Sequence, residues 1–151
     1  MINPPIALYY MQGLNTTAVH AHGALYGVYG TLGLGLLLFC FRAMDPERKW
    51  NTKLLAFAFW AINIGMLLEI LLSLLPIGLM QTYQSVAEGY WSARSPEFMQ
   101  TPLMQTLRWM RLFGDTIFAI GAVAFVWFAL GLIFKHEKRT VKEAELEPAI
   151  A

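Results

Sequence analysis

The chain has 151 residues, of which 57% are hydrophobic and only 14% are charged, and its formal net charge is +1. This composition is more apolar than that of an ordinary soluble domain and favours a membrane protein. The near-neutral charge argues against a nucleic-acid partner, and the single cysteine, Cys40, excludes an intrachain disulfide and a thiolate cluster.

Three apolar segments are long enough to cross a bilayer, for which a helix needs roughly 20 residues. They run over about residues 17–41, 54–80 and 112–134. Tryptophans fall near the ends of these segments, where the aromatic residues of membrane proteins gather at the lipid boundary; they are Trp50, Trp91 and Trp109. The sequence therefore predicts an all-α membrane protein in which residues 1–151 form a single membrane segment with three transmembrane helices.

Two of the three histidines, His20 and His22, stand one residue apart at the start of the first apolar segment. Imidazole is costly in hydrocarbon unless it binds a metal or a hydrogen-bonding partner. Residues two apart on an α-helix are separated by about 200° around the axis, so we expect the two rings to serve different partners. A helix wedged between two flat cofactors would use them as metal ligands. Hydrogen bonds from both rings to backbone or water are the structural alternative.

Small residues recur every fourth position in the same segment, at Gly23, Gly27, Thr31 and Gly35. Such a stripe lets another helix backbone, or the edge of a porphyrin, approach closely. Simple helix packing is the plainer interpretation for residues 27–35, whereas Gly23 lies beside the histidines and is a candidate for cofactor clearance.

Charged groups interrupt the second and third segments. Glu69 lies deep in the second, six residues after Asn63, so both side chains are expected inside the bundle or along a wet path. A proton relay and a structural hydrogen bond to a neighbouring helix are equally good interpretations of Glu69. Asp115 follows Arg111 by four residues, a spacing that lets the two meet on one helix face.

The basic residues are distributed unevenly between the two sides of the predicted membrane. Eight lie in the turn near residue 48 and in the C-terminal tail, and three lie in the connection over residues 81–111. The positive-inside rule therefore predicts an outward N-terminus and a cytoplasmic C-terminus. His136 is expected to be a solvated residue at the cytoplasmic end, and residues 138–151 are expected to be poorly ordered.

Several motifs occur in a characteristic order: YYMQGLNTT at residues 9–17, HAHGA at 20–24, GVYG at 27–30, EGYWSARS at 88–95, RWMR at 108–111 and GDT at 114–116. Together they resemble the C-terminal part of bacterial nitric oxide reductase, in the haem-copper oxidase superfamily, and the quinol-oxidising, single-subunit type most closely. The resemblance covers nearly the whole chain. Oxygen-reducing relatives usually carry an aromatic residue between and after the two histidines, so Ala21 and Gly23 favour the nitric oxide branch.

The resemblance implies that the three spans correspond to the last three helices of a haem-copper oxidase-type bundle. By the same resemblance, His20 is the axial ligand of the high-spin haem b and His22 an axial ligand of the low-spin haem b. Arg94, Arg108 and Arg111 become partners of haem propionates. Asp115 approximately matches a carboxylate implicated in binding quinol, the expected electron donor.

The other ligands that the resemblance implies lie on helices outside this chain. These are the second axial ligand of the low-spin haem and the ligands of a non-haem iron that belongs to the complete enzyme. We therefore expect the chain to act with the remaining helices of a reductase in the bacterial inner membrane, which converts two nitric oxide molecules to nitrous oxide and water. The alternatives are a non-catalytic three-helix assembly protein and a fragment of an oxygen-reducing oxidase.

Overall fold

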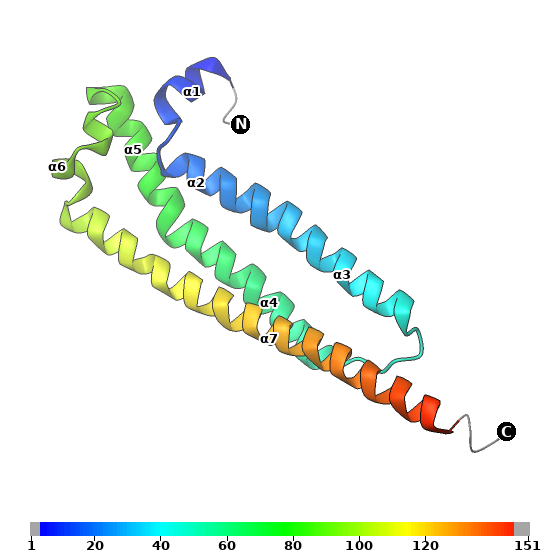
Figure 1. Cartoon of the computed structure of the whole chain (residues 1–151). Helices are drawn as coiled ribbons and strands as arrows, with labels where there is room; N and C mark the ends of the chain where they lie inside the picture. Colours follow the sequence, from blue (N-terminus) through cyan, green and yellow to red (C-terminus); the bar gives the residue numbers. More distant parts are fainter. Residues whose placement is uncertain (1–3, 147–151) are drawn as a thin grey trace.

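The computed structural model describes residues 4–146, and the side chains of residues 4–134. Within these residues all the regular structure is helical, and three helices are long and apolar enough to cross a membrane, as predicted. Figure 1 shows them as three long rods joined by connections at alternate ends. The candidate spans are Asn15–Met44, Thr52–Glu88 and Pro102–Phe134.

Each of the first two spans contains a π-helical segment. The first is built from α2 (Asn15–Ala21), η1 (His22–Gly30) and α3 (Thr31–Met44), and the second from α4 (Thr52–Glu69), η2 (Ile70–Leu74) and α5 (Leu75–Glu88). Pro76 explains η2, since a proline ring collides with the carbonyl group four residues earlier and the helix widens to avoid it. No proline accompanies η1, which begins at His22. Short π segments inside α-helices occur frequently at functional sites.

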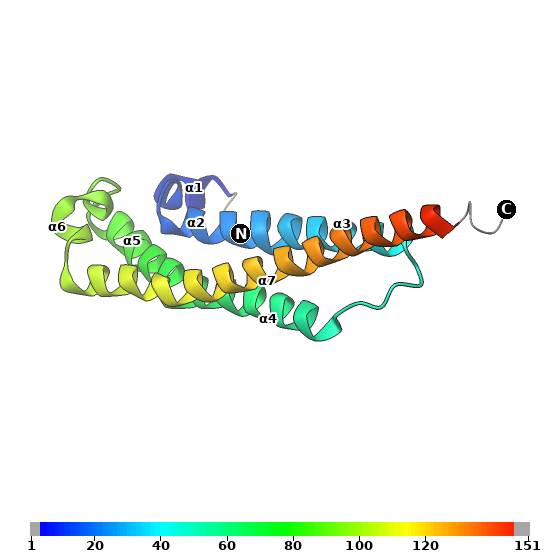
Figure 2. The ribbon, with the colours of Figure 1, turned by 60° about the horizontal axis from the view of Figure 1, so that its bottom comes forward.

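The short helices gather at one end of the molecule. They are α1 (Pro5–Met11), the 3₁₀ turn η3 (Ser92–Arg94) and α6 (Pro96–Met99). Gly13 and Gly89 take positive φ angles of 76° and 99° where the chain leaves α1 and α5. Figure 2 shows the opposite end, where an extended connection joins α3 to α4 on the side of the C-terminus.

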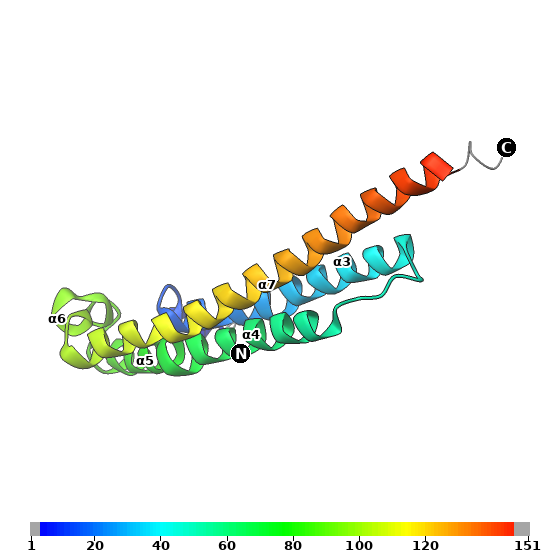
Figure 3. The ribbon, with the colours of Figure 1, turned by 90° about the horizontal axis from the view of Figure 1, so that it is seen from below.

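Helices α4 and α7 (Pro102–Leu146) cross in close contact along much of their length (Figure 3). Glycines at the crossing allow the backbones of α4 and α7 to come this close. A Cβ atom added to Gly114 would lie 2.5 Å from the backbone nitrogen of Glu69, and one added to Gly121 would lie 2.7 Å from that of Ile62. Gly65 faces the backbone of Phe118 in the same way. The backbones therefore meet as they do in small-residue membrane interfaces.

The backbone of the first span comes closest to the other spans near its beginning, although Leu34 and Leu38 farther along still pack against the cluster of Ala58, Ile62 and Phe125. Near the beginning, Gly78 of α5 lies so close to Thr16 that an added Cβ would be 2.7 Å from the backbone nitrogen of Thr16. Farther along, α3 diverges from α4 (Figure 1). Of the predicted small-residue stripe, Gly27 faces the second span, since an added Cβ would lie 3.5 Å from Cε of Met66, whereas an added Cβ at Gly23 or Gly35 would meet nothing within 4 Å in residues 4–134.

The helices extend beyond the predicted ends. The third begins at Pro102, ten residues before the expected start, and the helix continues to Leu146. Helical backbone thus continues through residues 138–146, and the expectation that this part is poorly ordered stays a prediction. The expectation for residues 147–151 lies outside the described residues, and the side chain of His136 lies outside those that the structure describes.

Candidate functional site

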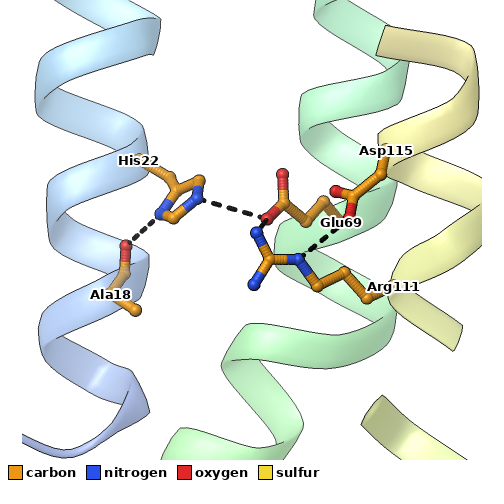
Figure 4. Close-up of polar contacts among 5 residues, drawn as sticks. All are labelled: Ala18, His22, Glu69, Arg111 and Asp115. Atoms are coloured by element: carbon orange, nitrogen blue, oxygen red, sulfur yellow. Dashed lines mark hydrogen bonds and ion pairs between the residues drawn. The ribbon is translucent and has the colours of Figure 1, made fainter. Parts of the chain in front are cut away.

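The two histidines of the HAH motif lie in different surroundings. His20 belongs to α2, is exposed, and makes no side-chain hydrogen bond with residues 4–134. His22 opens the π segment η1, is half-buried, and points toward the second and third spans, as Figure 4 shows. The two rings therefore lie in different surroundings, as their positions on the helix predict.

Both ring nitrogens of His22 have neighbours within the chain (Figure 4). Nδ1 lies 2.8 Å from the carbonyl oxygen of Ala18, one helical turn earlier, and this oxygen can only accept a hydrogen bond. Nε2 lies 3.2 Å from Oε1 of Glu69. The ring of Tyr26 packs nearby, with the two ring centroids 5.8 Å apart. The orientation of His22 is thus set by its own helix and by a carboxylate of the second span.

Glu69 is the centre of a polar network that joins all three spans. It is the last residue of α4 and only 6% exposed. Its Oε1 lies 2.9 Å from Nη2 of Arg111, and Nε of Arg111 donates to Oδ2 of Asp115 at 3.0 Å. The contacts of Oε1 have ion-pair distances without the alignment of hydrogen bonds. The predicted pairing of Arg111 with Asp115 on one helix face is confirmed, and so is the burial of Glu69.

The glycine crossing brings this network together. Gly114 lies between Arg111 and Asp115 in sequence, and its missing side chain lets α7 approach the backbone of Glu69. Arg111 and Asp115 remain partly exposed, with 45% and 42% of their side-chain surfaces accessible. The network therefore combines one buried carboxylate with a guanidinium and a second carboxylate that a ligand can reach from outside the bundle.

The other two predicted arginines make no contact with this network. Arg94 lies in η3, where its Nη1 donates to the Tyr90 hydroxyl at 3.0 Å and its guanidinium lies over the Tyr90 and Trp91 rings. The Tyr90 hydroxyl in turn donates to the carbonyl oxygen of Gln12 at 2.8 Å. Arg108 is exposed and makes no ion pair or hydrogen bond with the described side chains.

Two polar residues of the second span have partners that the sequence analysis did not find. For Glu69, the sequence predicted burial but not the contacts with His22 and Arg111. Gln81 is buried; its Oε1 accepts from the backbone nitrogen of Asn15 at 2.9 Å, and its Nε2 donates to the carbonyl oxygen of Ala93 at 3.2 Å. It fixes the start of the first span, which carries both histidines. The sequence signal for Gln81 was that this polar residue directly follows the apolar segment over residues 54–80.

The described side chains do not by themselves assemble a metal site, because no three His, Cys, Asp or Glu residues among them are grouped to hold an ion. His20 and His22 are therefore single donors, each of which needs further ligands from a cofactor or another helix. A family-level comparison gives the context for such donors.

The family model described as cytochrome c and quinol oxidase polypeptide I matches residues 1–117. No curated protein matches the chain. The family match includes the HAH motif, the Glu69 network and the whole second span, and the three apolar helices agree with a multi-pass membrane protein. The chain therefore belongs to the family of polypeptide I of the cytochrome c and quinol oxidases, the haem-copper respiratory oxidoreductases.

Proposed function

We propose that the chain is part of a nitric oxide-reducing membrane enzyme and supplies one axial imidazole to each of two haems. The observation that carries the proposal is the contrast between two histidines of one helix. His22 faces the Glu69 network inside the three spans, whereas His20 lies on an exposed face of the first span. One helix could thus serve two iron centres on its two sides.

The surroundings of His20 fit a flat cofactor. Its ring is free of hydrogen bonds with the described side chains. A Cβ added to Gly23 would meet nothing within 4 Å, so no other part of residues 4–134 covers this position. A neutral imidazole on an open face of a membrane helix is the donor that haem iron accepts.

The donor atoms of His22 also fit an axial ligand. In a neutral ring whose Nδ1 donates to the Ala18 carbonyl, Nε2 carries the lone pair that binds a metal. Glu69 contacts that same nitrogen in this chain. Ligation by His22 would therefore replace the Glu69 contact, while the hydrogen bond to Ala18 keeps the ring oriented.

Haem, when bound, supplies one-electron transfer and an iron that binds the small substrate. The histidines of this chain would hold the haems through their imidazole nitrogens, and its arginines would offer cations to the carboxylates of the cofactor. Arg94 and Arg108 have exposed side chains at the end of the molecule that is nearer the histidines, which supports such a role. The remaining helices of the enzyme would add the other axial ligand and the ligands of a non-haem iron.

The nitric oxide branch is supported by the small residues of the HAH motif. Ala21 and Gly23 stand where oxygen-reducing relatives usually carry aromatic side chains. The proposed reaction is the reduction of two nitric oxide molecules by two electrons and two protons to one nitrous oxide and one water. Quinol is the proposed electron donor, and the partly exposed pair of Arg111 and Asp115 offers both a donor and an acceptor for its polar head.

The haem proposal is tested by co-expressing the chain with the upstream helices of a nitric oxide reductase and recording optical and electron paramagnetic resonance spectra. His20→Ala should remove the high-spin signal, and His22→Ala the low-spin signal. His136→Ala is the matched control and should leave both. If both signals survive in the His20 and His22 variants, the ligation proposal fails.

The quinol proposal has its own test in the same complex. Asp115→Asn should raise the KM for quinol at least severalfold while both haem spectra stay unchanged. An unchanged KM would contradict a role of Asp115 in binding quinol, without touching the assignment of the histidines.

A second function is favoured by a specific contact. Because Glu69 already occupies Nε2 of His22, the imidazole could serve only to tie the first span to the second in a non-catalytic assembly protein. In that case the chain, purified with the upstream helices, would acquire no low-spin haem, and Glu69→Ala would destabilise the bundle as much as His22→Ala.

We also propose that the N-terminus faces outward and the C-terminus faces the cytoplasm of a bacterial inner membrane. The support is the excess of basic residues near residue 48 and in the C-terminal tail. A reporter enzyme that is active only outside the cytoplasm, fused after the last residue, should be inactive. An active fusion would reverse the proposed orientation.

A further inference from the structure

A groove lies at the end of the spans where the connection from α3 meets α7. The connection supplies its basic rim, and α4 and α7 supply its apolar walls. The residues that matter most for its chemistry are Arg48, Lys49, Leu54, Trp127, Phe128 and Gly131. The groove is separate from the histidines and from the Glu69 network.

The rim of the groove carries net positive charge. Residues 42–53 hold four basic side chains and two carboxylates, Asp45 and Glu47. Lys49 is exposed, lines the groove and has no hydrogen bond or ion pair with the described side chains. Arg48 is fixed at the rim because its Nη2 donates to the carbonyl oxygen of Gly131 at 3.1 Å. Among the described side chains, the rim thus offers an anion Arg48, which is held in place, and Lys49, which has no partner there.

The walls of the groove are apolar and open. Trp127 is 71% exposed. A Cβ added to Gly131 would meet nothing within 4 Å, so the glycine leaves space that no described part of the chain fills. Leu54 lies in the first turn of the second span, and Gly131 lies within the last turn of the third. The groove therefore runs from the membrane boundary into the region of the acyl chains.

We propose that this groove binds an anionic phospholipid. Its phosphate lies on Lys49 and Arg48, and one acyl chain lies along Leu54 and Trp127. Basic pockets at the ends of transmembrane helices recognise anionic head groups, and each basic side chain near an anionic lipid contributes about a fivefold gain in affinity. The combination of a charged rim, an interfacial tryptophan and an apolar wall fits a lipid better than an inorganic anion, which would make no use of the wall.

The charge of the rim is tested on the full chain in detergent micelles by native mass spectrometry with dioleoyl phosphatidylglycerol and dioleoyl phosphatidylcholine. The wild-type chain should retain phosphatidylglycerol in preference to phosphatidylcholine. Lys49→Gln should weaken that binding about fivefold. Lys53→Gln removes the same charge four residues later in the chain, outside the groove, and should change the binding little. Equal loss in both variants, or no preference between the two lipids, would overturn the proposal.

The shape of the groove is tested by Gly131→Leu, which places a larger side chain at a position where an added Cβ would meet nothing within 4 Å in the described chain. This variant should lose the retained lipid while its circular dichroism and thermal unfolding stay those of the wild type. A folded Gly131→Leu chain that still binds phosphatidylglycerol would overturn the proposal. Displacement of the lipid by millimolar inorganic phosphate alone would assign the site to a simple anion and would also overturn it.

Discussion

The glycine crossing between α4 and α7 predicts a specific loss of stability in Gly114→Ala. The added Cβ would lie 2.5 Å from the backbone nitrogen of Glu69 and 2.8 Å from its Cα atom. Backbone atoms cannot rotate away, so the helices must separate. Overpacking of this kind costs about 1–3 kcal/mol, and the better helix propensity of alanine offsets at most about 1 kcal/mol. With the full offset, we expect a net loss of up to about 2 kcal/mol.

Gly131→Ala is the matched control in the same helix. Its Cβ would meet nothing within 4 Å, so only the propensity gain applies and stability should stay unchanged or rise by up to about 1 kcal/mol. Unfolding in mixed detergent micelles, followed by tryptophan fluorescence and circular dichroism, measures both variants. Equal stabilities of the two variants would refute the close crossing, because the substitutions differ only in what the new methyl group meets.

Three further predictions concern polar side chains. Gln81→Leu should lower the free energy of unfolding by about 2 kcal/mol, because the backbone groups that its amide binds lose a buried partner; an unchanged value would contradict the role of this bridge. Glu69→Gln should cost about 1–2 kcal/mol in the same assay, since Arg111 loses its buried carboxylate but stays partly hydrated, and wild-type stability would contradict this estimate. The pKa of Glu97 is held below its ordinary value by its own backbone N–H group and by Ser95. The stabilisation is therefore present above the ordinary pKa and disappears as the pH falls through the lowered one. A carboxyl titration by NMR should show the low pKa in the wild type and a higher one in Ser95→Ala.

Much of the fold followed from local patterns. The three spans could be predicted because a membrane-crossing helix needs an unbroken apolar run, and such runs are visible in the sequence. The pairing of Arg111 with Asp115 could also be predicted, because residues four apart on a helix are neighbours whatever else surrounds them. The separation of His20 from His22 is local geometry of the same kind.

The ends of the helices were predicted less well. Hydropathy identifies the part of a helix that lies in hydrocarbon, whereas backbone hydrogen bonds decide where the helix stops. The third helix therefore starts at Pro102 and continues to Leu146, through residues whose charge marks only the membrane boundary.

The sequence by itself determined that this is a chain of three membrane helices with two oppositely placed imidazoles and a carboxylate buried in its second span. Only the tertiary structure decided which groups meet. Gly65, Gly114 and Gly121 make the close crossing, while Gly23 and Gly35 of the more regular stripe face open space. The reason is physical: the spacing of residues along one helix fixes which face they share, but the distance and rotation between helices decide which faces pack together. Those same distances bring Glu69 to His22.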